Sequence, residues 1–461
     1  MGLDKAKVAL LLTVAALAVV VSGCGRQPAS TPTLESTSTP QLPSAERLGM
    51  VWQAAGVLDE SYVKTGSVST ERLAGGAIEG MLEMAETSPY PLLTRLDEVK
   101  GDLPKDVPQG LEDVWRTWVL LLMQKPELDP EAVARSAVDG MALAVGDPLV
   151  EVLNAKDYER AREFFEGGYQ GIGAVVGEQG DHHIIAAIMS GGPAEQAGLE
   201  PGDSILAVNE ESADGLTVEE LVQRVRGPEG SEVVLTVLRE GWAGPREVRV
   251  VRGTVQMPTV AGRLLPDNIG YLYIGRFSDN TGQEFLKELR ALLDGGARAL
   301  VLDMRSNPGG SLAGVVDIVS QFVRQGLVYY EMDNDGTRTD WPVKEEGTAL
   351  GIPLAVLVDE QSASAAEIVA GALQDHHRGR LFGEQTYGKG TLNSFRQLDS
   401  GLAIYVAVAH WYTPEGRAIQ GQGITPDEGV RPTIDDLRLG RDPVVEAALR
   451  YLKAQVGSGT R

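Results

Sequence analysis

The chain has 461 residues, 43 % of them hydrophobic, and a formal net charge of −24. This length predicts about three domains with ordinary apolar cores. The acidic balance argues against a nucleic-acid partner, because phosphate binding needs clustered Lys and Arg. One cysteine and five histidines cannot supply the usual zinc-binding patterns, so we predict no metal and no cofactor.

The N-terminus predicts export and a lipid anchor. Residues 8–21 form an apolar run that is shorter than the ~20 residues of a membrane-spanning helix, which favours a signal peptide. The run ends in Val21-Ser22-Gly23-Cys24, which resembles a bacterial lipobox, in which the cysteine is lipidated; a chance free thiol is the alternative. We predict a lipoprotein signal peptide at 1–23 and a disordered tether rich in Ser, Thr and Pro at 24–44. Cys24 would then anchor the protein outside the cytoplasm, on the outer face of the cytoplasmic membrane or in the periplasm.

Residues 45–162 have apolar positions at three- and four-residue spacing, which predicts a helical region. Two of its segments, 71–82 and 131–142, have similar sequences. Gly80 and Gly140 occupy matching positions in them. Two interpretations remain open: a duplicated helical unit, or two amphipathic helices that share common residues.

Residues 163–253 change to short strands and glycine turns. One helix is expected at 217–225, with Thr217 as its N-cap. Many small β-rich domains have a comparable order of short strands and one helix. The expected strands are 172–176, 184–189, 205–208, 233–239 and 247–251.

The residues of this unit resemble a PDZ domain. The resemblance rests on Tyr169-Gln170-Gly171-Ile172-Gly173, on Gly192-Pro193-Ala194 through Gly198-Leu199, and on Gly202-Asp203 leading into the next strand. A PDZ domain adds an extended peptide to a sheet edge and binds its terminal carboxylate on backbone amides. The resemblance implies that Gly171, Ile172 and Gly173 form that carboxylate-binding loop; an ordinary strand-entry turn is the alternative.

Residues 254–437 alternate buried strands with helices, which predicts an α/β core, and residues 438–461 form a C-terminal helix or tail. The expected strands are 269–274, 299–303, 354–358 and one near 401–409. The expected helices are 282–293, 315–323 and 365–373.

Ser364 and Lys389 are the candidate catalytic pair of this core. Ser364 lies in the run Ser362-Ala363-Ser364-Ala365-Ala366-Glu367, at the start of a predicted helix whose free N–H groups suit an oxyanion. Lys389 lies between two glycines, 25 positions further on. Serine needs a base to become a nucleophile, and burial can lower the pKa of a lysine enough for it to serve.

Two further motifs accompany the pair. Asp303-Met304-Arg305-Ser306-Asn307-Pro308-Gly309-Gly310 ends a strand in a turn that can present N–H groups to an anion. The stretch Trp411-Tyr412-Thr413-Pro414-Glu415-Gly416-Arg417, continuing to Asp427, is a long glycine-rich loop of polar composition.

Together these motifs resemble the carboxy-terminal processing proteases, the tail-specific serine peptidases of family S41, over residues 169–427. The resemblance implies a core related to the ClpP and crotonase fold, with Ser364 as nucleophile and Lys389 as base. It implies oxyanion donors among the backbone amides of Gly309, Gly310 and Ala365. Asp375 is a further motif residue, to which we assign a supporting role.

One departure from the family pattern concerns the lysine. The usual family pattern has a glutamine four residues after the lysine, where this chain has Asn393. Asparagine keeps the amide and loses about 1.3–1.5 Å of reach. If Asn393 orients the catalytic Lys389, a backbone shift or a water molecule must compensate.

Three other motifs predict different chemistry less well. Residues 383–390 almost match a phosphate-binding loop, but Gly390 replaces the Ser or Thr that binds Mg²⁺, and a strand should follow. Residues 310–314 miss the spacing of a nucleophile elbow. A Ser–His–Asp triad through Asp375 with His376 or His377 is allowed by order alone.

The leading hypothesis is a membrane-tethered serine endopeptidase that captures unstructured protein C-termini on its PDZ domain. Its partners would be unfolded or C-terminally exposed proteins and the membrane, with a homo-oligomer possible by analogy. The alternative is a catalytically weak or inactive peptide-binding sensor or scaffold of the cell envelope, motivated by Asn393 and by the long helical region.

Overall fold

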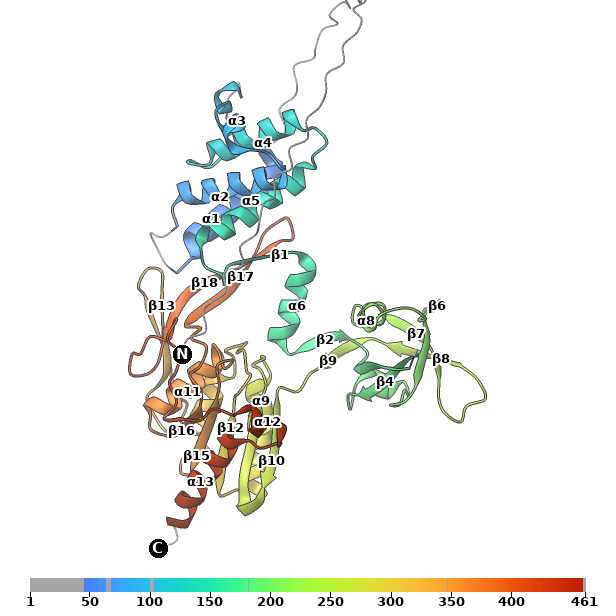
Figure 1. Cartoon of the computed structure of the whole chain (residues 1–461), viewed down its shortest axis with the longest axis vertical. Helices are drawn as coiled ribbons and strands as arrows, with labels where there is room; N and C mark the ends of the chain where they lie inside the picture. Colours follow the sequence, from blue (N-terminus) through green and yellow to red (C-terminus); the bar gives the residue numbers. More distant parts are fainter. Residues whose placement is uncertain (1–44, 64–67, 100–102, 181, 346, 459–461) are drawn as a thin grey trace, which may run out of the picture. The chain divides into compact units, whose positions relative to one another are not determined.

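A computed structural model describes residues 45–63, 68–99, 103–180, 182–345 and 347–458 (Figure 1). The predicted signal peptide, Cys24 and the tether lie outside these residues. Among the residues that are described, no helix is both long enough and apolar enough to cross a membrane.

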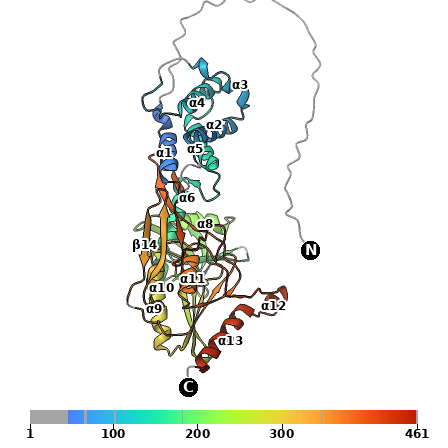
Figure 2. The same ribbon diagram turned by 90° about the vertical axis from the view of Figure 1, so that its left-hand side faces the viewer.

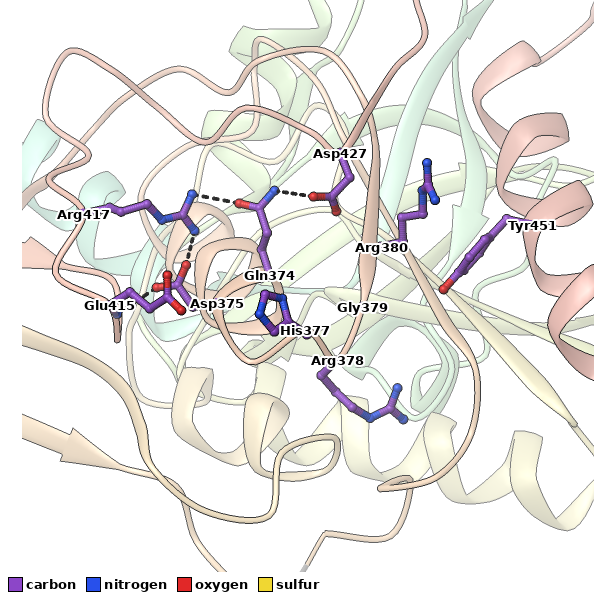
Figure 3. A pocket seen from close by; sticks show the side chains of 10 residues that line it. All are labelled: Gln374, Asp375, His377, Arg378, Gly379, Arg380, Glu415, Arg417, Asp427 and Tyr451. Atoms are coloured by element: carbon purple, nitrogen blue, oxygen red, sulfur yellow. Dashed lines mark hydrogen bonds and ion pairs between the residues drawn. The ribbon is translucent and has the colours of Figure 1, made fainter. Parts of the chain in front are cut away.

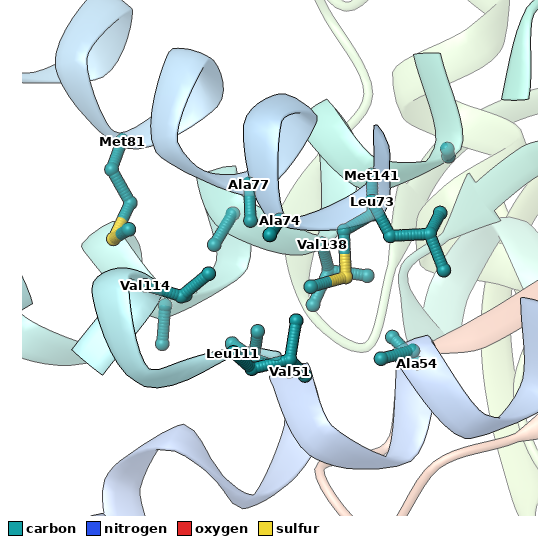
Figure 4. Close-up of a cluster of buried hydrophobic side chains, with 14 of the residues drawn as sticks. Val51, Ala54, Leu73, Ala74, Ala77, Met81, Leu111, Val114, Val138 and Met141 are labelled. Carbon is teal, nitrogen blue, oxygen red and sulfur yellow. The ribbon is translucent and has the colours of Figure 1, made fainter. Parts of the chain in front are cut away.

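The N-terminal region is helical, as predicted, and it contains one short strand that the sequence did not indicate. Its core holds small and medium side chains such as Ala77, Val138 and Met141, which Figure 4 shows between the helices. Its elements are α1 (Gly49–Ser61), α2 (Thr70–Met84), α3 (Pro89–Leu93), α4 (Glu112–Gln124), α5 (Pro130–Val145), β1 (Glu151–Leu153) and α6 (Ala155–Glu166), with 3₁₀ turns at Ala45–Leu48 and Leu96–Glu98.

Helices α2 and α5 carry the two similar segments, and they pack directly on each other (Figure 1). A Cβ on Gly80 would lie 2.1 Å from the Ser136 carbonyl oxygen, and one on Gly140 would lie 2.1 Å from the Gly76 oxygen. In the sequence Gly80 matches Gly140 and Gly76 matches Ser136, so matching positions meet reciprocally, as across a two-fold axis. This reciprocity fits the duplication hypothesis, and both interpretations of the two segments remain open.

The β-rich unit has a sheet of order β3-β4-β5-β7-β8, with β6 paired to β5, and a separate β2–β9 pair. Thr217 caps α8 through a capping box with Glu220. Strand β3 is an edge strand, and α8 packs beside it. The elements are β2 (Gly168–Gly171), β3 (Ala174–Gln179), β4 (His182–Ile188), α7 (Pro193–Gln196), β5 (Ser204–Val208), β6 (Glu211–Ser212), α8 (Val218–Val225), β7 (Glu232–Leu238), β8 (Arg246–Val251) and β9 (Gly253–Gln256).

The α/β core has a sheet of order β10-β11-β12-β15-β16-β19, parallel from β11 onward. A second sheet joins β1, β18, β13 and β14, with β17 paired to β18. The elements are β10 (Val260–Leu265), a 3₁₀ turn (Pro266–Asn268), β11 (Ile269–Ile274), α9 (Thr281–Asp294), β12 (Ala299–Asp303), α10 (Val315–Ser320), β13 (Leu327–Asp333), β14 (Arg338–Pro342), β15 (Leu354–Val358), α11 (Ala365–Asp375), β16 (Arg380–Gly383), β17 (Thr391–Gln397), β18 (Ala403–Tyr412), β19 (Glu428–Gly429), α12 (Ile434–Arg438) and α13 (Pro443–Ser458).

Both faces of the parallel sheet are buried, which explains its uninterrupted apolar strands. In β12, Leu300 and Leu302 join the core formed with α9, α10 and α11, whereas Ala299 and Val301 join a second core formed with α13. Figure 2 shows α9 and α13 on different sides of this region. The carboxyl ends of β12 and β15 therefore lie next to each other, where the motif loops begin.

Packing of α2 on α5 gives a stability prediction. Gly80→Ala should lower the free energy of unfolding by about 1–3 kcal/mol, because its new methyl group has no space beside Ser136. The matched control is Gly75→Ala in the same helix, where an added Cβ meets nothing within 4 Å. The control should leave stability unchanged or raise it by up to ~1 kcal/mol through helix propensity. Urea unfolding measures both, and equal effects of the two substitutions would contradict the close approach.

Candidate active site

Ser364 lies at the turn between β15 and α11, the position predicted for it. Its backbone has φ 55° and ψ −116°, a sparsely populated conformation for a non-glycine residue. Its neighbours Ala363 and Ala365 are buried, and Ser364 itself is partly exposed. The turn thus holds the serine hydroxyl at a surface with small side chains on either side.

Lys389 lies on the loop between β16 and β17, packed against the glycine-rich loop after Ile419. A Cβ on Gly390 would lie 2.3 Å from the Gln420 backbone nitrogen, and Gly388 has φ +90°. The flanking glycines are therefore required by this close approach. Burial lowers the pKa of Lys389, although the charges of Glu151 and Glu367 act in the opposite direction.

The Lys389 ammonium donates to the Tyr405 hydroxyl at 3.4 Å and lies 5.5 Å from the centre of the Tyr405 ring. Within the described part of the chain, no hydrogen bond joins Lys389 to Ser364. In sites without substrate, catalytic contacts are often long and tighten when substrate binds. The lack of a Lys389–Ser364 hydrogen bond is therefore compatible with a joint role of the two residues.

Glu367 connects the serine and lysine loops. It is fully buried in the first turn of α11. Its Oε2 accepts the backbone N–H groups of Ser364 at 2.8 Å and Lys389 at 2.9 Å, and its Oε1 accepts the Gly388 N–H at 2.7 Å and the Thr386 hydroxyl. Burial raises the pKa of Glu367, and these four donors oppose the rise. One carboxylate therefore sets the spacing between both loops.

The Asn-Pro-Gly-Gly turn lies directly against Ser364. A Cβ on Gly309 would lie 2.7 Å from the Ser364 Cβ, and Gly309 has φ +91°. The Gly309 N–H donates to the Asn307 side chain at 2.9 Å. Among the described residues, the N–H groups of Gly310 and Ala365 have no such acceptor. Of the three predicted oxyanion donors, Gly310 and Ala365 are the two whose N–H groups are free.

Among the hydrogen bonds of the described residues, none joins Asn393 to Lys389. The Asn393 amide nitrogen donates to the Leu149 carbonyl at 3.2 Å, and its amide oxygen accepts from the Thr391 hydroxyl at 2.9 Å. It also follows a register irregularity between β17 and β18. The side-chain hydrogen bond of Lys389 in this structure goes to Tyr405 instead.

Asp375 lies at the end of α11, away from Ser364, and it holds the Thr413–Arg417 turn. Its carboxylate accepts from the Glu415 N–H at 2.9 Å and from the Arg417 guanidinium, which also donates to Gln374 at 2.8 Å. Figure 3 shows this network at a polar pocket of about 520 Å³. These contacts fit the supporting role assigned to Asp375.

Two of the three rival motifs, the histidine triad and the phosphate-binding loop, are not assembled as their chemistry requires. The His376 ring bonds the Leu327 carbonyl at 2.7 Å, and Asp375 is committed to Arg417 and Glu415, so neither forms a triad with Ser364. Gly390 is followed by strand β17, whereas a phosphate-binding loop needs a helix there.

The predicted carboxylate-binding loop, Gly171 to Gly173, joins β2 to the edge strand β3. The Ile172 carbonyl accepts from Ala194 at 2.7 Å, and Gly173 has φ +76°. Tyr169, in the strand before this loop, has its ring centre 4.5 Å from the Arg226 guanidinium carbon.

Two residues of the site were missed from the sequence. Glu367 had a detectable signal, because Ser364-Ala365-Ala366-Glu367 has the spacing of a capping box. Tyr405 had none, since its position opposite Phe395 and Glu151 depends on strand register.

The fold and site define a peptidase-like α/β core that carries a PDZ domain. A PDZ domain profile matches residues 184–239, and a profile of peptidase family S41 matches residues 268–430. The chain is 34 % identical over 330 residues to a carboxyl-terminal-processing protease of Synechocystis sp., covering 70 % of this chain and 77 % of that one. It is 30 % identical to the carboxy-terminal processing protease CtpA of Bacillus subtilis, covering 72 % and 70 % of the two chains.

The chain therefore belongs to the carboxyl-terminal-processing protease family, as its motifs indicated, and the predicted fold class is confirmed. Among solved structures, the photosystem II D1 C-terminal processing protease matches 85 % of this chain and 95 % of its own, with 24 % identity and a TM-score of 0.47.

The Glu367 contacts give a prediction about loop stability. Glu367→Gln should lower the free energy of unfolding by about 1–3 kcal/mol, because a carboxamide has one acceptor oxygen and faces its NH₂ toward buried donors. Glu360→Gln is the control, since that carboxylate is exposed. Amide hydrogen exchange at Ser364 and Lys389 should accelerate in the Glu367 variant. Unchanged exchange at both amides would contradict the proposed linkage.

Proposed function

We propose that this family member is a serine endopeptidase with a Ser364–Lys389 dyad. The observation that carries the proposal is the shared Glu367 carboxylate, which accepts the backbone N–H groups of both residues. Positioning by one buried group suits two side chains that act together. The strained Ser364 backbone and the Gly309 contact support the same assignment.

In this mechanism neutral Lys389 removes the Ser364 hydroxyl proton as Oγ attacks the substrate carbonyl carbon. The N–H groups of Gly310 and Ala365 stabilise the oxyanion that forms. The lysine then gives its proton to the leaving amine, and an acyl-enzyme remains. Water, activated by Lys389, attacks the acyl group, and the substrate acid and the free serine are released.

Tyr405 has the orienting role that the family pattern assigns to a glutamine. Its hydroxyl accepts one N–H of Lys389. The lone pair of the neutral lysine amine can then face Ser364. Asn393 is occupied by Leu149 and Thr391 and cannot do this without moving.

The PDZ domain would supply the substrate. Edge strand β3 beside α8 suits addition of an extended peptide, with its carboxylate on the Gly171–Gly173 loop. Unfolded proteins with free C-termini are the substrates that this capture favours. We further propose that Cys24 is lipidated and holds the enzyme outside the cytoplasm, on the basis of the sequence around it.

The nucleophile has a direct test. Purified protein should cleave an unfolded protein substrate, and Ser364→Ala should reduce cleavage at least about a thousand-fold, because the attacking oxygen is removed. Ser400→Ala, on an exposed turn, makes the same chemical change and should cleave like the parent. Equal turnover by the Ser364→Ala and parent proteins would exclude Ser364 as nucleophile.

The lysine base gives a pH prediction. Glu151 raises the pKa of Lys389, and Lys389 is active only when neutral. Glu151→Gln should therefore lower that pKa and move the acid limb of the kcat/KM profile to lower pH. The shift should be less than about one pH unit, because solvent and salt screen the exposed carboxylate. In ~1 M salt the two profiles should coincide. A shift to higher pH would argue against Lys389 as the base.

A second candidate function is a peptide-binding sensor with little catalysis. The observation in its favour is that Asn393 is turned toward Leu149 while Lys389 bonds Tyr405 rather than Ser364. The same assay separates the two functions. A sensor would bind C-terminally free peptides and leave substrate intact with or without Ser364.

A further inference from the structure

A cavity of about 500 Å³ opens beside the Asn-Pro-Gly-Gly turn. Gly310 lines it, next to the Gly309 that packs on Ser364. Asn393, four residues after Lys389, lines its other side. The cavity therefore borders both loops of the proposed dyad. If the carbonyl oxygen of a substrate residue accepts the Gly310 N–H, the side chain of that substrate residue lies beside this opening.

Most of the cavity wall is apolar. Leu312 and Val316 come from the turn and helix α10, and Leu392 comes from β17. Tyr329 and Trp341 pair across β13 and β14, and their rings stack with centroids 5.6 Å apart and planes 8° apart. Such a wall suits a long apolar stem rather than a charged or branched polar group.

Glu331 is the acidic residue of this wall, which also includes the polar residues Ser311, Lys344 and Asn393. It lies two residues after Tyr329 on β13, so both side chains face the cavity. Its Oε2 is buried and has no hydrogen-bond partner among the described residues. Burial raises the pKa of Glu331. Lys344 also lines the cavity, but its ammonium pairs with Asp317.

An unsatisfied buried carboxylate oxygen is costly, and a ligand that donates to it recovers that cost. We propose that this cavity binds the substrate side chain whose carbonyl is attacked, and that Glu331 selects a side chain with an apolar stem and a terminal N–H donor, as in lysine. The inference rests on the proposed peptidase function, and it adds a specificity-determining residue to it.

The experiment uses the full chain and two quenched peptides that differ at one position, lysine against norleucine, which has a similar stem and no donor. The parent should cleave after lysine with kcat/KM roughly tenfold or more above norleucine. Glu331→Met should abolish that preference, and Glu331→Gln should weaken it. Asp340→Asn, exposed on the same hairpin, is the control and should keep it. Mass spectrometry assigns the cleaved bond.

Binding of the same peptides to the Ser364→Ala protein, measured by fluorescence anisotropy, separates the two claims. Cleavage with an equal lysine-to-norleucine ratio in parent and Glu331→Met would overturn the specificity inference and leave the peptidase intact. Absence of cleavage in the parent would overturn the peptidase. The ratio of the affinities for the lysine and norleucine peptides would then test Glu331. If Glu331→Met binds both peptides as the parent does, the proposed role of Glu331 is refuted.

Discussion

The geometry of the site depends on one buried carboxylate. Glu367 accepts two backbone N–H groups on one oxygen, and these come from residues 25 positions apart in the chain. Ser364 and Lys389 belong to separate loops, and neither loop has regular structure of its own. Because a buried carboxylate must be satisfied by donors, the fold has one favourable arrangement of these loops. Glu367 belongs to helix α11, which packs on the parallel sheet, so its hydrogen bonds fix both loops relative to that sheet.

Glycines make that arrangement sterically possible. Gly309 allows the motif turn to approach Ser364, and Gly390 allows the lysine loop to approach Gln420. A side chain at either position would collide with backbone, which cannot rotate away. The positive φ of Gly309 adds a second requirement for glycine. The two backbone contacts thus require glycine at these positions. This requirement explains why the glycines are useful as sequence motifs.

Much of this fold is predictable from local sequence. Strands β11, β12 and β15 have the expected bounds, since both of their faces are buried and each is a short apolar run. The capping box at Thr217 marks the start of α8. Hairpin β13–β14 was not expected, because its strands mix polar and aromatic residues, and β14 is exposed along its length. Strand β13 also pairs with β18, a partner about 80 residues further along the chain that local sequence does not reveal.

The site shows the same division between local and distant information. Ser364, Lys389 and the turn at Gly309 follow from motifs, whereas the partner of the lysine depends on register. In β18, Tyr405 pairs with Phe395 of β17 and with Glu151 of β1. A shift by one residue would turn the Tyr405 hydroxyl to the other face of the sheet.

In the proposed mechanism, the environment of Lys389 accounts for the shorter amide at position 393. A base lysine needs low polarity, so that its neutral form is favoured, and one acceptor that fixes its direction. Aromatic rings supply both requirements here. Phe165 and Phe395 pack on Tyr405, with centroids 6.4 and 4.7 Å from its ring, and Tyr405 presents a hydroxyl to the ammonium. A phenol reaches further from its strand than a carboxamide does, and its ring excludes water along the way. In that mechanism Tyr405, on the strand next to β17, orients the lysine, while Asn393 bonds Leu149.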